Sequence, residues 1–163
     1  QTAYVMTWYE DIFNELAKKK NLDKAADVKA ELISKRIVLN FNQDSVKTAQ
    51  VIKTIKALAD GGTKPEAVII DGFDFSKAVP DSMQQMKAFA REMGISIWYS
   101  ANAEPSEKGF PKDLLPFKND LDVVLHLDSK SDCIQIVALK EHDRTEYVTD
   151  LKLDVKTLLI ADK

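Results

Sequence analysis

Three polar side chains stand at the ends of two apolar runs, where a parallel sheet would bring them together. Asp71 follows the run AVII at residues 67–70, and Ser100 and Asn102 end the run that begins at Ile95. Ligands of open parallel sheets gather outside the carboxyl ends of the strands. A carboxylate at such an end can orient the water shell of Mg²⁺, which bridges the phosphates of a nucleotide. Asp71, Ser100 and Asn102 are therefore candidate ligand contacts, and Asp71 is a candidate magnesium contact through water.

A structural role for Asp71 is equally open, because an aspartate after a central strand also caps the next turn or helix. The same edge of the sheet would receive residues 7–11, which follow a short apolar run and include Glu10 and Asp11. These two acids also suit the first turn of a helix, where they favour the helix dipole. Which of these roles the three acids have depends on the helices and strands around them.

Strand and helix patterns alternate through the first two thirds of the chain. Apolar runs predict strands at residues 3–6, 36–41, 67–70 and 95–100, and helical spacing predicts helices at residues 8–20, 26–33, 46–59 and 80–93. The unbroken third run predicts a strand that is buried on both faces. Asp23 is expected to cap the second helix, and Asp44 or Ser45 the third. Pro80 and Gly94 are expected to bound the fourth helix.

The last third of the chain changes character. Residues 101–119 contain three prolines and little periodicity, which predicts a functional loop. Strands are then expected at residues 121–127, 133–140, 146–153 and 157–160. Alternating strands and helices followed by a strand-rich end predict an α/β fold, with a mainly parallel sheet flanked by helices and an antiparallel C-terminal extension.

Composition restricts the class of protein. The 163 residues, 45% apolar and 30% charged, suit one domain with one core. The net charge of −3 gives no support to nucleic-acid binding, which would need a local patch or an oligomeric ring. The single cysteine excludes an internal disulfide, and neither histidine has a second ligand at metal spacing, so no structural metal is expected. With no apolar run near the roughly 20 residues of a membrane span, a cytoplasmic protein is expected.

The strands and their polar ends resemble the RecA-like P-loop ATPase core, in particular the circadian-clock ATPases and the replicative hexameric helicases. The likeness covers most of the chain from Tyr4 onward. AVIIDGF resembles the magnesium strand of this family, which would put Asp71 in the Walker B position. IWYSANAE resembles the next strand, where Ser100 or Asn102 would sense the γ-phosphate. The resemblance implies ATP and Mg²⁺ as ligands and a homo-oligomeric ring or filament as the assembly.

A second resemblance lies near the C-terminus. LDVVLHLD followed by CIQIVALKEHDR is similar to the paired late strands of the family, whose end carries a Lys-x-Arg finger that reaches the neighbouring subunit's nucleotide. Lys140 and His142 stand at the matching positions, and Arg144 follows two residues later. Histidine thus stands where the family has arginine. A neutral imidazole donates one hydrogen bond, whereas a guanidinium is permanently charged and offers a fork of donors. The implied role of Lys140, His142 and Arg144 is a contact in trans, and an ordinary charged strand end is the open alternative.

Two features of the family are altered or missing. The family places adjacent glutamates, one of which activates water, after a strand of the YVM type; here Glu10 or Asp11 would supply that base. No G-x-x-x-x-G-K-[ST] occurs, and GGTK at residues 61–64 follows a helix and precedes a strand, the reverse of the required context. This loop supplies most of the attraction for phosphate. We therefore expect the chain to be a fragment that lacks the first strand, the phosphate loop and the first helix.

The resemblance implies part of an ATP-binding, oligomeric RecA-like ATPase, and the missing phosphate loop implies that this chain does not hydrolyse ATP alone and binds it no more tightly than about millimolar. It would be an enzyme if a phosphate loop lies upstream. The alternative is a non-catalytic interaction or regulatory module that retains the fold without nucleotide. An unrelated doubly wound binding or enzyme domain is also compatible with the pattern.

Overall fold

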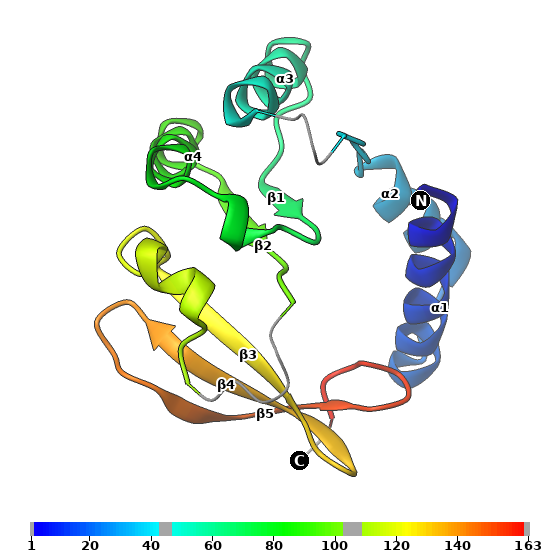
Figure 1. The fold of residues 1–163 in the computed structure, drawn as a ribbon. Helices are drawn as coiled ribbons and strands as arrows, with labels where there is room; N and C mark the ends of the chain where they lie inside the picture. The colour runs from blue at the N-terminus through cyan, green and yellow to red at the C-terminus, as the bar shows by residue number, and fades with distance from the viewer. Residues whose placement is uncertain (1, 43–46, 103–108, 162–163) are drawn as a thin grey trace. The chain divides into compact units, whose positions relative to one another are not determined.

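The computed structural model describes residues 2–42, 47–102 and 109–161. The chain divides into two compact units (Figure 1). Unit 1 combines residues 1–41, 125–138 and 147–163, and unit 2 combines residues 42–124 and 139–146. Each unit is described by itself.

Unit 2 contains a two-stranded parallel sheet. Strand β1 (Ala67–Ile70) pairs with β2 (Ser96–Tyr99) in a register that sets Ile69 beside Trp98. Both strands are where the apolar runs predict them. The expected burial of β1 on both faces is wrong, because Ile69 is 67% exposed and Trp98 52% exposed. The alternating burial along both strands shows that unit 2 covers only one face of this sheet.

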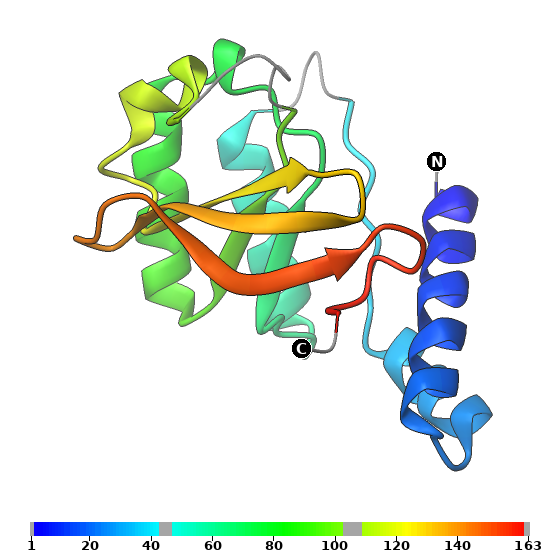
Figure 2. The ribbon, with the colours of Figure 1, turned by 90° about the horizontal axis from the view of Figure 1, so that it is seen from below.

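Helices α3 (Thr48–Asp60) and α4 (Pro80–Met93) lie against each other and on the same side of the parallel sheet (Figures 1 and 2). Both helices confirm the sequence prediction. Pro80 begins α4, where its missing N–H is not needed, and Gly94 ends it in the left-handed conformation with φ 63°. The predicted caps of α3, at residues 44 and 45, lie outside the described residues.

The core of unit 2 lies where α4 meets two short 3₁₀ helices. Helix η1 (Phe75–Lys77) contacts η2 (Lys112–Phe117), and η2 also contacts α4. Residues 109–119, which the sequence predicts to be a loop, thus contain a 3₁₀ helix that contributes to the core, because Phe117 is only 2% exposed. Among the described residues of unit 2, the buried apolar side chains are Ile55, Phe75, Met83, Met86, Phe89, Phe117, Val124 and Leu139.

In unit 1 the first helix begins earlier than the sequence predicts. Helix α1 (Thr2–Lys20) includes residues 3–6, so the predicted strand there is wrong. The reason is visible in the burial pattern, since the half-buried side chains recur at helical spacing from Val5 and Met6 through Tyr9 to Ile12 and Phe13. The apolar run at the start of the chain is thus the first part of a helical stripe.

Helix α2 (Ala25–Ser34) follows, as predicted, but its N-cap is Lys24 and not Asp23. The predicted strand at residues 36–41 is wrong. The segment is irregular, and the Arg36 guanidinium carbon lies 3.8 Å from the centre of the Tyr9 ring. A strand needs a partner for its backbone hydrogen bonds, and none of the strands in the described residues pairs with this segment.

A separate antiparallel sheet contains β3 (Val123–Ser129), β4 (Cys133–Glu141) and β5 (Tyr147–Asp154) in that order, side by side in Figure 2. These three strands confirm the prediction for residues 121–153. The fourth predicted strand, residues 157–160, is wrong, because that segment forms a turn and a single bridge between Leu153 and Ile160. The fold is mixed α/β with two separate sheets, where a single, mainly parallel sheet with an extension is expected from the sequence.

The Gln135 side chain bridges β4 and β5 at a register shift, and we expect it to stabilise the sheet there. Its buried amide, 8% exposed, donates to the carbonyl oxygens of Thr149 at 2.8 Å and Leu151 at 3.0 Å, where the register shifts. Gln135→Ala should lower the free energy of unfolding by about 1–3 kcal/mol, because both carbonyls lose a buried donor. Chemical denaturation checks this. Gln84→Ala, on an exposed face of α4, is the matched control, and an equal effect of both variants would contradict the role of Gln135.

Candidate functional site

Asp71 and Ser100 meet in a turn just beyond the ends of the two parallel strands. The Ser100 hydroxyl donates to Asp71 Oδ1 at 2.5 Å and accepts from the Gly72 amide at 2.9 Å. The backbone adds a bond from the Phe73 amide to the Ser100 carbonyl oxygen at 2.8 Å. Gly72 takes φ 66°, a left-handed conformation that glycine adopts without a Cβ clash. We call Asp71, Gly72, Phe73 and Ser100 the Asp71 turn.

Aromatic packing supports this turn from the core of unit 2. The Phe73 ring lies 4.8 Å from the Phe75 ring and 5.0 Å from the Tyr99 ring, and Phe75 in turn contacts Phe117 at 5.7 Å. Burial raises the pKa of Tyr99 to about 12. Edge-on aromatic contacts of this kind are favourable and directional. The Asp71 turn therefore rests on a packed base although its own polar side chains reach solvent.

The two acids of the DGFD sequence have different surroundings. Asp74 caps η1, because its Oδ1 accepts from the Ser76 hydroxyl at 2.6 Å and from the Ser76 amide at 3.1 Å. The Ser76 hydroxyl bond, followed by the Lys77 contact, lowers the pKa of Asp74. Asp71 has only the Ser100 hydroxyl on Oδ1, and within the described residues its Oδ2 has no hydrogen-bond partner. Asp71 is thus the acid with an oxygen available to a ligand.

The Asp71 turn suits magnesium in one respect only. Mg²⁺ in nucleotide sites is held by one or two carboxylates, by phosphates and by retained waters. An exposed carboxylate with one open oxygen fits a contact through such a water. No group of three or more His, Cys, Asp or Glu side chains occurs in the described ranges that could hold a metal without phosphates. The turn can contribute to a magnesium-nucleotide site but does not constitute one.

The other predicted site residues do not take part in the hydrogen bonds of the Asp71 turn. Asn102 is exposed and makes no hydrogen bond to Asp71 or Ser100. Glu10 and Asp11 belong to unit 1, whereas Asp71 belongs to unit 2. Their predicted place in a first helical turn is wrong, since both lie in the middle of α1, and Glu10 pairs with Lys29 at 3.0 Å.

The end of β4 shows three different environments for the predicted trans-acting donors. The Lys140 amine donates to the carbonyl oxygen of Leu121. His142 has left-handed φ 52°, and its backbone amide donates to the Asp122 carbonyl oxygen at 2.7 Å. Arg144 pairs with Glu141 at 3.4 Å and remains exposed. Of the three side chains, only that of His142 has no hydrogen bond or ion pair within the described residues.

The same region contains charged residues that sequence reasoning missed. Lys87 of α4 donates to Asp122 Oδ1 at 3.0 Å and to the Asn119 carbonyl oxygen at 3.1 Å. The Lys87 bond is the main reason that the pKa of Asp122 is lowered, and the charges of Arg91 and His142 add to it. The four-residue spacing of Lys87 and Arg91 on a predicted helix was the available signal. The contact of Lys87 with Asp122, 35 residues further along the chain, could not be predicted from that spacing.

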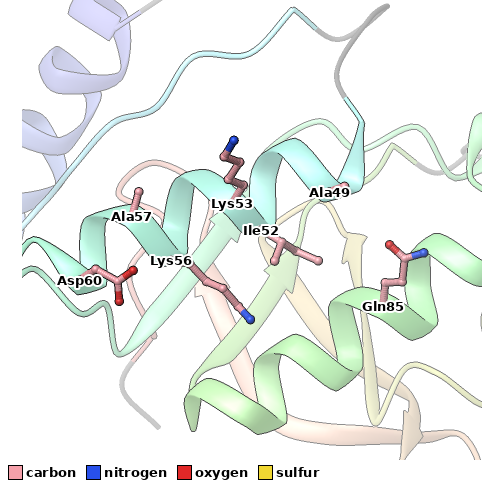
Figure 3. Close-up of a pocket in the computed structure, with 7 residues that line it drawn as sticks. All are labelled: Ala49, Ile52, Lys53, Lys56, Ala57, Asp60 and Gln85. Carbon is pink, nitrogen blue, oxygen red and sulfur yellow. The ribbon is translucent and has the colours of Figure 1, made fainter.

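A shallow hollow of about 510 Å³ lies along α3, with Gln85 of α4 at its border (Figure 3). Lys56 extends between the helices, where it pairs with Glu92 at 2.8 Å, while Lys53 points away from α4 in Figure 3. The residues that line the hollow are Ala49, Ile52, Lys53, Lys56, Ala57, Asp60 and Gln85. Because its polar groups do not converge on one point, the hollow is a weaker candidate than the Asp71 turn.

No protein-family model and no curated protein matches the sequence. Among the helices of the described ranges, none has the length and apolar character that crossing a membrane requires. The evidence for a functional site is therefore the geometry of two charged regions, the Asp71 turn and the end of β4.

Proposed function

We propose that the chain is part of a RecA-like, nucleotide-dependent oligomeric ATPase, in which Asp71 contacts Mg²⁺ through water. The observation that carries the proposal is the Asp71 turn itself. An exposed carboxylate and a hydroxyl stand together beyond the carboxyl ends of two parallel strands, which is where open α/β sheets bind their ligands. Magnesium bound there would neutralise charge on the phosphates during hydrolysis.

In this proposal Ser100 is a positioning residue. Its hydroxyl spans Asp71 Oδ1 and the Gly72 amide, so one carboxylate oxygen is fixed and the other is left toward solvent. A carboxylate held in one orientation loses less freedom when it orders the waters of a metal ion. The 163 residues contain no phosphate-loop motif, so the proposal assigns no phosphate-binding amides or lysine within them.

A non-catalytic module is the second candidate, and one observation favours it. The bond from Ser100 to Asp71 would stabilise the turn equally well in a protein without nucleotide. Ile69 and Trp98 also leave an apolar face of the parallel sheet exposed in unit 2, as a surface for a partner would. Nucleotide-dependent effects of Asp71 and Ser100 variants separate the two candidates, because a module without nucleotide shows none.

Ser100→Ala should reduce ATP hydrolysis by the natural oligomer about tenfold, since it removes a hydrogen bond to a carboxylate worth about 1.5 kcal/mol. Ser100→Thr keeps the hydroxyl and should retain most of the activity. Steady-state hydrolysis assays at saturating Mg-ATP measure both variants, with Ser76→Ala at the neighbouring η1 cap as the control. Equal activity of Ser100→Ala and the parent would contradict a positioning role for the hydroxyl.

A further inference from the structure

A group of charged side chains surrounds Asp122 in unit 2, away from the Asp71 turn in the sequence. Lys87 and Arg91 come from one face of α4, Lys140 from the end of β4, and His142 from the turn that follows it. Three permanent cations therefore accompany one carboxylate, in a chain whose net charge is −3. We call these five residues the Asp122 cluster.

Hydrogen bonds hold two of the three cations of the cluster and leave the third, Arg91, available. Lys87 donates to Asp122 and to the Asn119 carbonyl oxygen, and Lys140 donates to the Leu121 carbonyl oxygen. Arg91 is exposed, and its guanidinium makes no hydrogen bond or ion pair with any described residue. A guanidinium presents a planar fork of donors that matches the oxygens of a phosphate group.

The backbone conformation of His142 is a second observation that favours a site here. His142 is one of the few non-glycine residues with positive φ, a conformation that glycine or asparagine adopts at lower cost. Residues in such conformations are concentrated at functional sites. The turn is also fixed by the His142 amide bond to the Asp122 carbonyl oxygen and by the bridge between Glu141 and Arg144. The amide bond places His142 beside Asp122, which Lys87 of α4 also contacts.

We propose that the Asp122 cluster binds phosphate groups of a polyanionic ligand, with Arg91 and His142 as the contacting side chains. Lys87 neutralises Asp122 and thereby removes the main repulsion that an anion would meet. Asp143 and the paired Glu141 remain as flanking acids, which restricts the site to ligands with more than one negative charge. The proposal assigns Arg91, which the family resemblance did not indicate, and it does not depend on a nucleotide at Asp71.

The test is a titration of the ¹⁵N-labelled 163-residue chain with inorganic pyrophosphate, without divalent metal and at low salt. Saturable shifts of the Arg91 side-chain N–H and of the Asp122 and His142 amides are expected. Arg91→Ala should weaken binding at least about fivefold, and Arg91→Lys should recover only part of it, because lysine lacks the fork. Arg144→Ala is the control of equal charge, since Arg144 already pairs with Glu141, and should change the affinity less than twofold.

Further titrations identify which phosphate compound binds and distinguish binding at the Asp122 cluster from binding at the Asp71 turn. ADP that binds as tightly as pyrophosphate supports recognition of phosphate alone, and tighter ADP binding supports a nucleotide. His142→Gly should weaken pyrophosphate binding while the melting temperature stays the same or rises. Asp71→Asn should leave metal-free binding unchanged even if the proposed ATPase function is wrong. No saturable shift up to 10 mM pyrophosphate, on the order of the weakest useful affinity, or equal losses in Arg91→Ala and Arg144→Ala, overturns the proposal.

Discussion

In the proposed oligomeric ATPase, Asp71→Asn should lower ATP hydrolysis by at least about 100-fold, the usual effect of removing a preorganised charge from a phosphoryl-transfer site. Asparagine keeps the size of the side chain and can still accept the Ser100 hydroxyl bond. It loses the negative charge that orders the water shell of Mg²⁺. The expected result is therefore a loss of turnover with little change in folding, measured by steady-state hydrolysis and by thermal melting.

The matched control is Asp74→Asn, three residues further along the same segment. Asp74 is exposed like Asp71, but its oxygen atoms cap η1. Its replacement should weaken the cap and leave turnover within about twofold. If the two variants lose activity equally, then the effect comes from the stability of the segment and not from a magnesium contact.

Phe117→Ala should lower the free energy of unfolding by about 3–5 kcal/mol, the cost of replacing a large buried ring by a methyl group. Phe117 is the largest fully buried side chain of the described residues and packs in the cluster with Phe75 and Met83. Tyr99 and Phe73 pack against the same cluster. The cavity should consequently also loosen the Asp71 turn.

Leu115→Ala provides the comparison within the same 3₁₀ helix. Leu115 is 53% exposed, so its truncation should cost less than about 1 kcal/mol. Denaturant unfolding of both variants measures the difference. Hydrogen exchange at the Gly72 and Phe73 amides then reports the turn, and should be faster in Phe117→Ala only. Similar unfolding free energies for the two variants would show that Phe117 is not the centre of the unit 2 core.

Elements with strong local signals could be predicted from the sequence. Pro80 and Gly94 bound α4 because one lacks an N–H and the other accepts a left-handed conformation. Residues 36–41 have equally strong strand composition but are irregular, because a strand is decided by a partner that the sequence does not specify. Residues 3–6 were too few for helical and strand patterns to be told apart until the stripe was followed into α1.

The candidate sites likewise have features that the sequence predicts and features that it does not. Asp71 and Ser100 could be brought together from sequence because one rule, the carboxyl ends of parallel strands, applies to both. The hydroxyl bond that fixes one oxygen of Asp71 could not be predicted, since it depends on a side-chain rotamer. The Asp122 cluster was missed because Lys87 and Asp122 meet only through the packing of α4 beside η2.

The central claim, that Asp71 contacts a nucleotide-bound metal, is tested most directly by electron paramagnetic resonance of Mn²⁺ in place of Mg²⁺. Titration of the proposed oligomeric ATPase with Mn²⁺ and a non-hydrolysable ATP analogue gives the affinity for the metal-nucleotide complex. The account predicts that Asp71→Asn weakens this affinity about tenfold or more, the loss of one charge-assisted contact, while Asp74→Asn leaves it unchanged. Equal Mn²⁺-nucleotide affinity in the parent and in Asp71→Asn would contradict it.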